Sequence, residues 1–305
     1  LSREYITHFE DLSNELTYEI FEFLDYFHVY EAFFNLNQRF HSLLTNSTLP
    51  IRINISSISK STLQRYYADI ITSNKHRINL LNLSNLFMYD DRVFPLFHPM
   101  SKFHRLETLM LNNIESDCLK NILNQLTSLS FLSSLTISII DEIRDANPIY
   151  YQVFHLPALK YCKLSLKKCF TNEPLLIATV KYSPIEYLIL DNNIYVHQLN
   201  SFLSYVPHLR RLSFHSLCHS CTDQRKIWKN HLIHLTHLSL EMVSIEFDQF
   251  EQLVINLLPS VEVLRISGDA KYIDANRWKQ LILSHLPKLR IFDILLEFYI
   301  GNDDN

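Results

Sequence analysis

The chain has 305 residues, of which 47% are hydrophobic and 20% charged, and its formal net charge is −4. A chain of this length and composition can bury a substantial core, and its charge offers no attraction to duplex nucleic acid or an anionic membrane. It has 50 leucines but only two glycines, where ordinary composition gives about twenty glycines. Phosphate-binding loops and nucleophile elbows need several glycines, so we expect no cofactor. Together with the charge, this leads us to expect no nucleic acid and no membrane, and a partner that is another protein.

Residues 8–48 are predicted to form a small helical domain of three short helices. Apolar residues recur there at spacings of three and four, which places them on helix faces. The three sets are Leu16, Ile20, Leu24 and Phe27; Val29, Ala32, Phe33 and Leu36; and Phe40, Leu43 and Leu44. Ser13 is a suitable N-cap for the first helix. So short a segment is near the lower limit for independent folding, and we expect it to need the rest of the chain or a partner.

A leucine-rich motif of the form L-x-x-L-x-L repeats through residues 50–300. Two less regular copies begin at Pro50 and Ile78. Eight further copies follow at intervals of 24 to 28 residues, beginning at Leu106, Leu132, Leu159, Ile185, Leu209, Leu235, Val261 and Leu289. Each copy alternates apolar and variable positions, which is typical of a half-buried strand. The nearly constant period indicates a solenoid of about ten units.

The residues between the strand motifs are predicted to contain one helix per repeat. Apolar residues at spacings of three and four indicate helices over residues 116–126, 247–258 and 274–286. A proline that ends the preceding helix stands two residues before four of the motifs, at Pro157, Pro207, Pro259 and Pro287. Stacked repeats bury apolar faces that one strand and one helix cannot cover alone. An ordinary α/β domain with coincidental leucines is the alternative.

This repeat resembles the leucine-rich repeat family, in its longer form with a full helix in each unit. The resemblance departs after the strands, where the family's asparagine or cysteine is mostly replaced and Asn113 and Asn193 are the nearest matches. It implies an α/β fold in which a leucine-rich-repeat solenoid forms a horseshoe, with parallel strands on the concave face and helices on the convex face.

Residues 8–48 resemble the F-box family. The matching positions are Leu12-Ser13-Asn14-Glu15-Leu16, Ile20-Phe21, Leu24, Val29, Phe33, Leu36, Arg39-Phe40 and Leu43-Leu44. The departures are Ser13, where the family usually has proline, and Phe40, near where it usually has tryptophan. The position in front of a leucine-rich array is also shared with that family.

The two resemblances together imply an F-box protein with C-terminal leucine-rich repeats. Such a protein is the non-catalytic substrate-recognition subunit of an SCF-type E3 ubiquitin ligase: the F-box binds a Skp-type adaptor, and through it the cullin–RING ligase, while the repeats bind an unknown protein substrate. The alternative is a leucine-rich-repeat scaffold for protein interactions, in which the F-box-like segment only caps the solenoid.

The resemblance also assigns residues to the adaptor contact. These are Leu12, Glu15, Ile20, Phe21, Leu24, Val29, Phe33, Leu36 and Phe40. Several of them have an alternative role in the core of the three helices. For Leu16 and Leu24, packing in that core is at least as strong an expectation as contact with a partner.

Side chains that alternate with the buried leucines are expected to line the concave face and bind the substrate. The candidates are Tyr161, Lys163, Tyr187, Asp191, Arg211, His215, His237, Glu241 and Arg265. Aromatic and arginine side chains dominate protein hot spots, which favours Tyr161, Tyr187, Arg211, His237 and Arg265 among them. The alternative is a solvated sheet surface whose charges neutralise one another across neighbouring strands.

Neither metal binding nor catalysis is indicated. Cys218 and Cys221 form a single C-x-x-C pair, and His231 does not follow at zinc-finger spacing, so we expect no metal. Cys169 has only lysines beside it and no general base. The five cysteines are too sparse for a disulfide framework, and the first residues lack the apolar run of a secretory signal. We therefore expect a cytoplasmic or nuclear protein, or one found in both.

Overall fold

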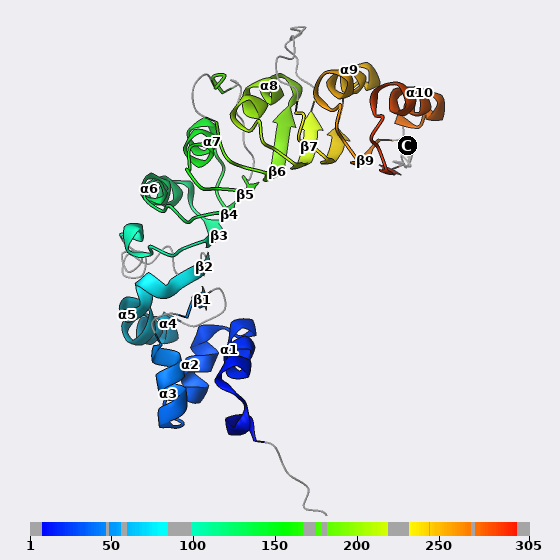
Figure 1. The fold of residues 1–305 in the computed structure, drawn as a ribbon. Helices are drawn as coiled ribbons and strands as arrows, with labels where there is room; N and C mark the ends of the chain where they lie inside the picture. Colours follow the sequence, from blue (N-terminus) through cyan, green and yellow to red (C-terminus); the bar gives the residue numbers. More distant parts are fainter. Residues whose placement is uncertain are drawn as a thin grey trace, which may run out of the picture. The chain divides into compact units, whose positions relative to one another are not determined.

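The computed structural model describes residues 8–46, 49–55, 60–84, 99–166, 175–178, 182–218, 232–243, 245–269 and 272–297 (Figure 1). It is an α/β fold with a ten-stranded parallel sheet, and the strands lie in the sheet in the order of the sequence. The chain divides into two compact units, Leu1–Met110 and Leu111–Asn305. The boundary falls within strand β3, Thr108–Ile114. The division of the chain into residues 8–48 and 50–300, which rests on motifs, stays a prediction.

The first unit begins with helices α1 (Asn14–Phe23), α2 (Tyr26–Phe33) and α3 (Gln38–Thr45), after a 3-10 turn, η1 (Phe9–Asp11). The three predicted helices are therefore present. Each starts at a polar side chain that accepts a hydrogen bond from a backbone N–H of its first turn, and these caps are Ser13, Asp25 and Asn37. The predicted cap at Ser13 is confirmed.

A small aromatic core holds these helices together. Val29 and Phe40 are completely buried, and the ring of Phe40 lies 5.8 Å from Phe9 and 5.2 Å from Phe33, measured between centroids. Arg39 joins the start of the segment to α3, because its guanidinium donates to the carbonyl oxygens of Glu10 and Leu12. Aromatic packing and this clamp allow a short segment to keep a defined arrangement.

The first unit continues into the sheet. Strand β1 (Ile51–Asn54) pairs with β2 (Ile78–Ser84), and between them lie α4 (Lys60–Tyr66), a π-helical turn η2 (Tyr67–Ile71), α5 (Thr72–Asn74) and a 3-10 turn η3 (Lys75–Arg77). Another 3-10 turn, η6 (Met100–Lys102), precedes β3. Asp25 links the helices to the sheet, because its Oδ2 accepts a hydrogen bond of 2.8 Å from the N–H of Asn54.

The second unit contains the most regular repeats. Its strands are β4 (Ser134–Ile139), β5 (Tyr161–Ser165), β6 (Tyr187–Tyr195), β7 (Arg211–Cys218), β8 (His237–Val243), β9 (Val263–Asp269) and β10 (Ile291–Glu297). Its helices are α6 (Ser116–Leu126), α7 (Asn147–Phe154), α8 (Val196–Tyr205), α9 (Phe247–Leu257) and α10 (Ala275–His285). Within this unit, Figure 1 shows the helices on one side of the strands.

All ten strand motifs read from the sequence are strands, and the three predicted helices correspond to α6, α9 and α10. The four prolines follow the ends of α7, α8, α9 and α10, as predicted. Asn113 is the one non-glycine residue in the described part of the chain with a positive φ, 54°. One helix in every repeat stays a prediction, because residues 167–174 and 219–231 lie outside the described part.

Matching motif positions face one another along the sheet. The fourth positions of seven successive motifs pair directly, in an unbroken row of Leu135, Cys162, Leu188, Leu212, Leu238, Leu264 and Phe292. A backbone pattern maintains this register: the carbonyl of Ser133 accepts hydrogen bonds from the N–H groups of both Lys160 and Tyr161, at 2.8 and 2.9 Å. The same paired bonds recur at the carbonyls of Lys160, Glu186, Arg210, Thr236 and Glu262.

Candidate functional site

Two surfaces carry the residues that the sequence singles out, and the first is on helix α1. Leu16, Ile20 and Leu24 follow one another at a spacing of four, and their exposed fractions lie between 36% and 48%. Phe23, which no motif position predicts, is 89% exposed. The expectation that Leu16 and Leu24 pack in the core is therefore wrong. Together with Ile20 and Phe23, these residues form an apolar stripe exposed to solvent on α1 and its C-cap. Phe23 follows Ile20 by three residues, and this helical spacing is the sequence signal that places it on the same face.

The nine residues assigned to the adaptor separate into three groups by exposure. Those on the surface are Glu15, Ile20, Leu24 and Leu36, and those partly covered are Leu12, Phe21 and Phe33. Val29 and Phe40 are completely buried, which corrects their assignment as contact residues. They fill the core between the helices, where a partner does not reach them without unfolding the segment.

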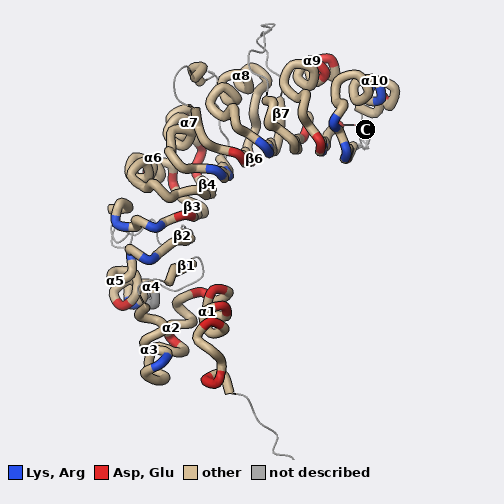
Figure 2. The backbone as a smooth tube through the Cα atoms, viewed as in Figure 1, with Lys and Arg blue, Asp and Glu red and all other residues tan. Residues whose placement is uncertain are grey.

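The apolar stripe lies beside negative charge. Glu15, Glu19 and Glu22 are exposed on α1, and this helix has no lysine or arginine (Figure 2). Hydrogen bonds from its own backbone N–H and from Ser13 lower the pKa of Glu15 and favour its charged form. A complementary partner surface is therefore apolar with basic groups at its edge.

The second surface is the face of the sheet opposite the buried leucines in the second unit. On β5, the side chains of Cys162 and Leu164 are buried, while those of Tyr161, Lys163 and Ser165 are partly exposed. All nine predicted substrate contacts lie at such alternate positions, and none of them is buried. The exposed members are Asp191, Arg211, His215 and Arg265, and the partly covered ones are Tyr161, Lys163, Tyr187, His237 and Glu241.

Several charges on this face are paired across neighbouring strands. Lys163 Nζ lies 2.8 Å from Asp191 Oδ2, which also accepts a hydrogen bond of 2.9 Å from Ser165. The hydrogen bond from Lys163 to Asp191 raises the pKa of Lys163. Arg265 Nε lies 3.1 Å from Asp293 Oδ2. Mutual neutralisation, the alternative considered for this face, therefore describes these two pairs, and exposed pairs of this kind contribute little to stability.

The middle of the face is different. Arg211 places its guanidinium 5.4 Å from the ring centre of Tyr187, which is a cation–π contact, and no salt bridge to it is found in the described part of the chain. His237 pairs directly with Arg211 along the sheet. Desolvation lowers the pKa of His237, and the charges of Arg211 and Arg265 lower it further, against an opposite effect from Glu262. On this part of the face, a cationic side chain, Arg211, therefore lies beside the aromatic ring of Tyr187.

The described residues include no group of three or more His, Cys, Asp and Glu side chains arranged to hold a metal ion. Cys169, Cys221 and His231 lie outside the described part. Burial raises the pKa of the Cys162 thiol, which is fully enclosed. Among the helices that the structure describes, none combines the length and the apolar character needed to cross a bilayer.

No model of a protein family and no curated protein matches this chain. The assignment of a function therefore depends on the repeat, the exposed stripe on α1 and the sheet face.

Proposed function

We propose that this chain is the substrate-recognition subunit of an SCF-type ubiquitin ligase. In this proposal residues 8–48 are an F-box that binds a Skp-type adaptor, and residues 50–300 are a leucine-rich-repeat solenoid that binds the target protein. The observation that carries the proposal is the exposed apolar stripe of α1 and its C-cap, made of Leu16, Ile20, Phe23 and Leu24, which precedes the parallel sheet in the sequence. Four large apolar side chains exposed on one short helix and its C-cap indicate a protein partner.

In this proposal the chain promotes the reaction by bringing the target and the ubiquitin-transferring subunits close together. The target is held on the sheet face, and the ligase subunits recruited through the adaptor bring an activated ubiquitin to one of its lysines. The chain itself then needs no nucleophile or general base, and it acts in the cytoplasm, the nucleus or both. Tyr187, Arg211 and His237 are the proposed centre of target binding, because they combine aromatic and cationic groups without a carboxylate partner between them.

Co-purification with a Skp-type adaptor tests the proposal. We expect the full chain to co-elute with the purified adaptor in size-exclusion chromatography. Ile20→Asp combined with Leu24→Asp places two charges in the stripe and is expected to weaken binding at least tenfold. Leu283→Asp changes an exposed leucine of α10, outside the stripe, and serves as the control, with binding unchanged. Absence of co-elution by the unchanged chain, or equal binding by the double variant, contradicts the proposal.

The second candidate function is a scaffold whose helical segment only covers the end of the sheet. Its support is the contact of α2 with the first repeat: Asp25 accepts the N–H of Asn54, and the rings of Phe27 and Tyr66 lie 5.0 Å apart. Open ends of repeat arrays need such covers. This candidate requires that the adaptor not bind, so the same co-elution experiment decides between the two.

A further inference from the structure

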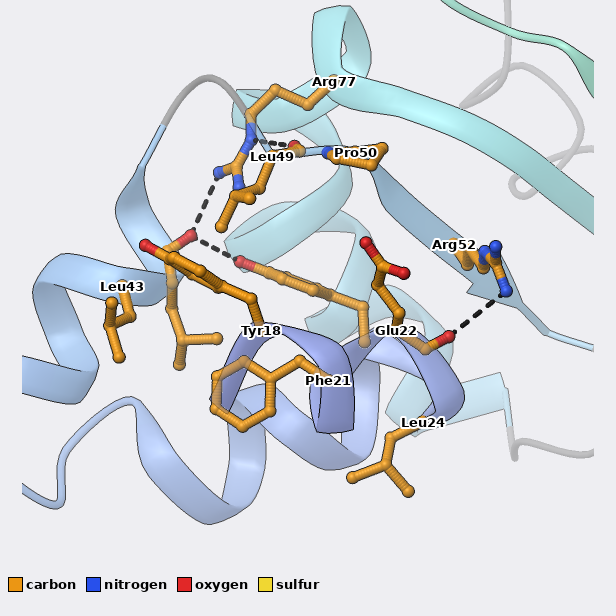
Figure 3. A pocket seen from close by; sticks show the side chains of 11 residues that line it. Tyr18, Phe21, Glu22, Leu24, Leu43, Leu49, Pro50, Arg52 and Arg77 are labelled. Carbon is orange, nitrogen blue, oxygen red and sulfur yellow. Dashed lines mark hydrogen bonds between the residues drawn. The ribbon is translucent and has the colours of Figure 1, made fainter. Parts of the chain in front are cut away.

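A cavity of about 90 Å³ lies in the first unit, at the place where α1, the end of α3 and the start of β1 meet (Figure 3). Its walls are mostly apolar and aromatic, and they include Tyr18, Phe21, Leu43, Leu49 and Pro50. One water needs roughly 10–15 Å³ on the same scale, so the cavity has room for roughly six to nine non-hydrogen atoms. Its mouth is bordered by Leu24, which is partly exposed.

Arg77 supplies a buried positive charge to this cavity. The residue is only 2% exposed. Its Nε donates to the carbonyl of Leu49 at 3.1 Å, and its Nη1 donates to the carbonyl of Leu44 at 3.1 Å and to Asn74 Oδ1 at 2.9 Å. Nη2 takes part in none of these three bonds, and the hydroxyl of Tyr26, which donates to the same Leu44 carbonyl, also interacts with the guanidinium.

No carboxylate neutralises this guanidinium within the part of the chain that the structure describes. Its hydrogen-bond partners are two backbone carbonyls, an amide and the hydroxyl of Tyr26, and all of them are neutral at pH 7. Burial lowers the pKa of Arg77, which expresses the cost of keeping the charge away from water. A buried charge without an opposite charge is unfavourable, and an anion that enters the cavity removes part of that cost.

The other two charged residues that border the cavity have opposite signs and are exposed to solvent. Glu22 and Arg52 both border the cavity, and Arg52 Nη1 donates to the backbone carbonyl of Glu22 at 3.2 Å. Among the charged residues that border the cavity, Arg77 is therefore the buried one. Arginine forms charge-assisted hydrogen bonds with carboxylates, and Nη2 is the guanidinium nitrogen left to donate one, so a carboxylate matches this charge.

We propose that this cavity is a binding site for a small organic carboxylate with an apolar body, which lies among Tyr18, Phe21 and Leu43 while its carboxylate faces Arg77. The size of the cavity, its apolar walls and its single buried guanidinium are the features that such a ligand fits. The site is distinct from the sheet face, and the proposal does not depend on ubiquitin-ligase function.

Binding of benzoate to the full chain tests the charge requirement. Benzoate has nine non-hydrogen atoms, and benzyl alcohol has a similar shape without the charge. In ligand-observed NMR titrations at constant ionic strength, we expect saturable binding of benzoate and an affinity for benzyl alcohol at least tenfold lower. No binding of benzoate at 10 mM, or equal affinity for both compounds, overturns the proposal, and equal affinity identifies a purely apolar cavity.

A variant at the mouth tests the location without disturbing the buried arginine. Leu24→Trp places a larger side chain at the entrance and is expected to weaken benzoate binding at least tenfold. Leu283→Trp, which enlarges an exposed leucine that does not line the cavity, is the matched control and is expected to bind as the unchanged chain does. Thermal unfolding confirms that both variants are folded. A folded Leu24→Trp chain that binds benzoate with unchanged affinity overturns the proposal.

Discussion

Single residues in this chain have roles set by what lies within a few ångströms of them. Gly268 on β9 is an example, because it faces Met242 of the neighbouring strand and the ring of Tyr272. A Cβ atom added at this position meets the Met242 carbonyl oxygen at 3.0 Å and the Tyr272 ring at 3.2 Å. Glycine here permits the close approach of a strand and an aromatic ring.

Gly268→Ala is expected to destabilise the second unit. The carbonyl oxygen belongs to the backbone of β8 and the Tyr272 hydroxyl is held by the carbonyl of Ile245, so neither neighbour moves freely. Overpacking of this kind costs about 1–3 kcal/mol of unfolding free energy. Urea unfolding measures it, with Ser267→Ala as the control on the adjacent, partly exposed position. Equal stability of the two variants contradicts the argument.

Asp25 gives the first unit a defined response to pH. Burial raises the pKa of its carboxyl, and this outweighs the hydrogen bonds from Phe27 and Asn54, each 2.8 Å long. The folded state therefore holds this proton more tightly than the unfolded state, whose pKa is about 3.9. The protonated Asp25 carboxyl therefore contributes to the stability of the folded state. This contribution is fully present below the unfolded pKa and is lost as the pH rises through the pKa of the folded state.

The comparison of the chain with its Asp25→Asn variant isolates this effect. The variant places an amide N–H against one of the two backbone N–H donors, which lowers its stability by an amount independent of pH. We expect the stability advantage of the unchanged chain over the variant to be smaller at pH 7 than at pH 4, by urea unfolding. Asp274→Asn, at the exposed cap of α10, controls for the substitution itself. If the stability advantage of the unchanged chain over Asp25→Asn increases from pH 4 to pH 7, the pKa of Asp25 is not raised in the folded state and the prediction is wrong.

At the scale of elements, helix boundaries follow from local hydrogen bonding. Ser13 begins α1 with φ of −64° and ψ of 161°, and its hydroxyl accepts a hydrogen bond from the N–H of Leu16. Leu12 before it is extended, with φ of −65° and ψ of 146°. Both conformations suit a proline at position 13, because proline requires such a φ and an extended residue before it.

Two substitutions at this position separate the cap from the backbone effect. Ser13→Ala loses the side-chain cap, which costs about 0.5–2 kcal/mol. Ser13→Pro loses the same cap but restricts the unfolded chain, which returns about 0.4–1 kcal/mol. We therefore expect the proline variant to be more stable than the alanine variant by about 0.4–1 kcal/mol in urea unfolding. A proline variant less stable than the alanine variant shows that the backbone at α1 does not accept proline.

At the scale of the whole molecule, neighbouring repeats support one another through a continuous buried row. Leu238 pairs with Leu212 on one side and with Leu264 on the other, and all three are nearly inaccessible to solvent. Each repeat contributes one member to the row and covers the next. Stability in such an array is a sum of contributions from units and from the contacts between neighbours.

Leu238→Ala is expected to cost about 2–5 kcal/mol of unfolding free energy, because it opens a cavity between three strands. Ser239→Ala changes the next residue, whose side chain lies on the opposite face, and is expected to alter stability by less than about 0.5 kcal/mol. Urea unfolding of both variants checks the contrast. If Leu238→Ala lowers the unfolding free energy by less than about 1 kcal/mol, the buried row does not contribute to stability as proposed.

The amino-acid sequence by itself determined the ten strands, the repeat period, the ends of helices at prolines and the three helices of residues 8–48. These features arise from local hydrogen bonding and from apolar periodicity, which are written in nearby residues. Only the tertiary structure decided that Leu16 and Leu24 face outward while Val29 and Phe40 are enclosed, that Lys163 pairs with Asp191, and that Arg77 is buried beside a cavity. Exposure and charge pairing depend on which distant segments pack together. The periodicity of apolar residues within one segment does not predict those contacts.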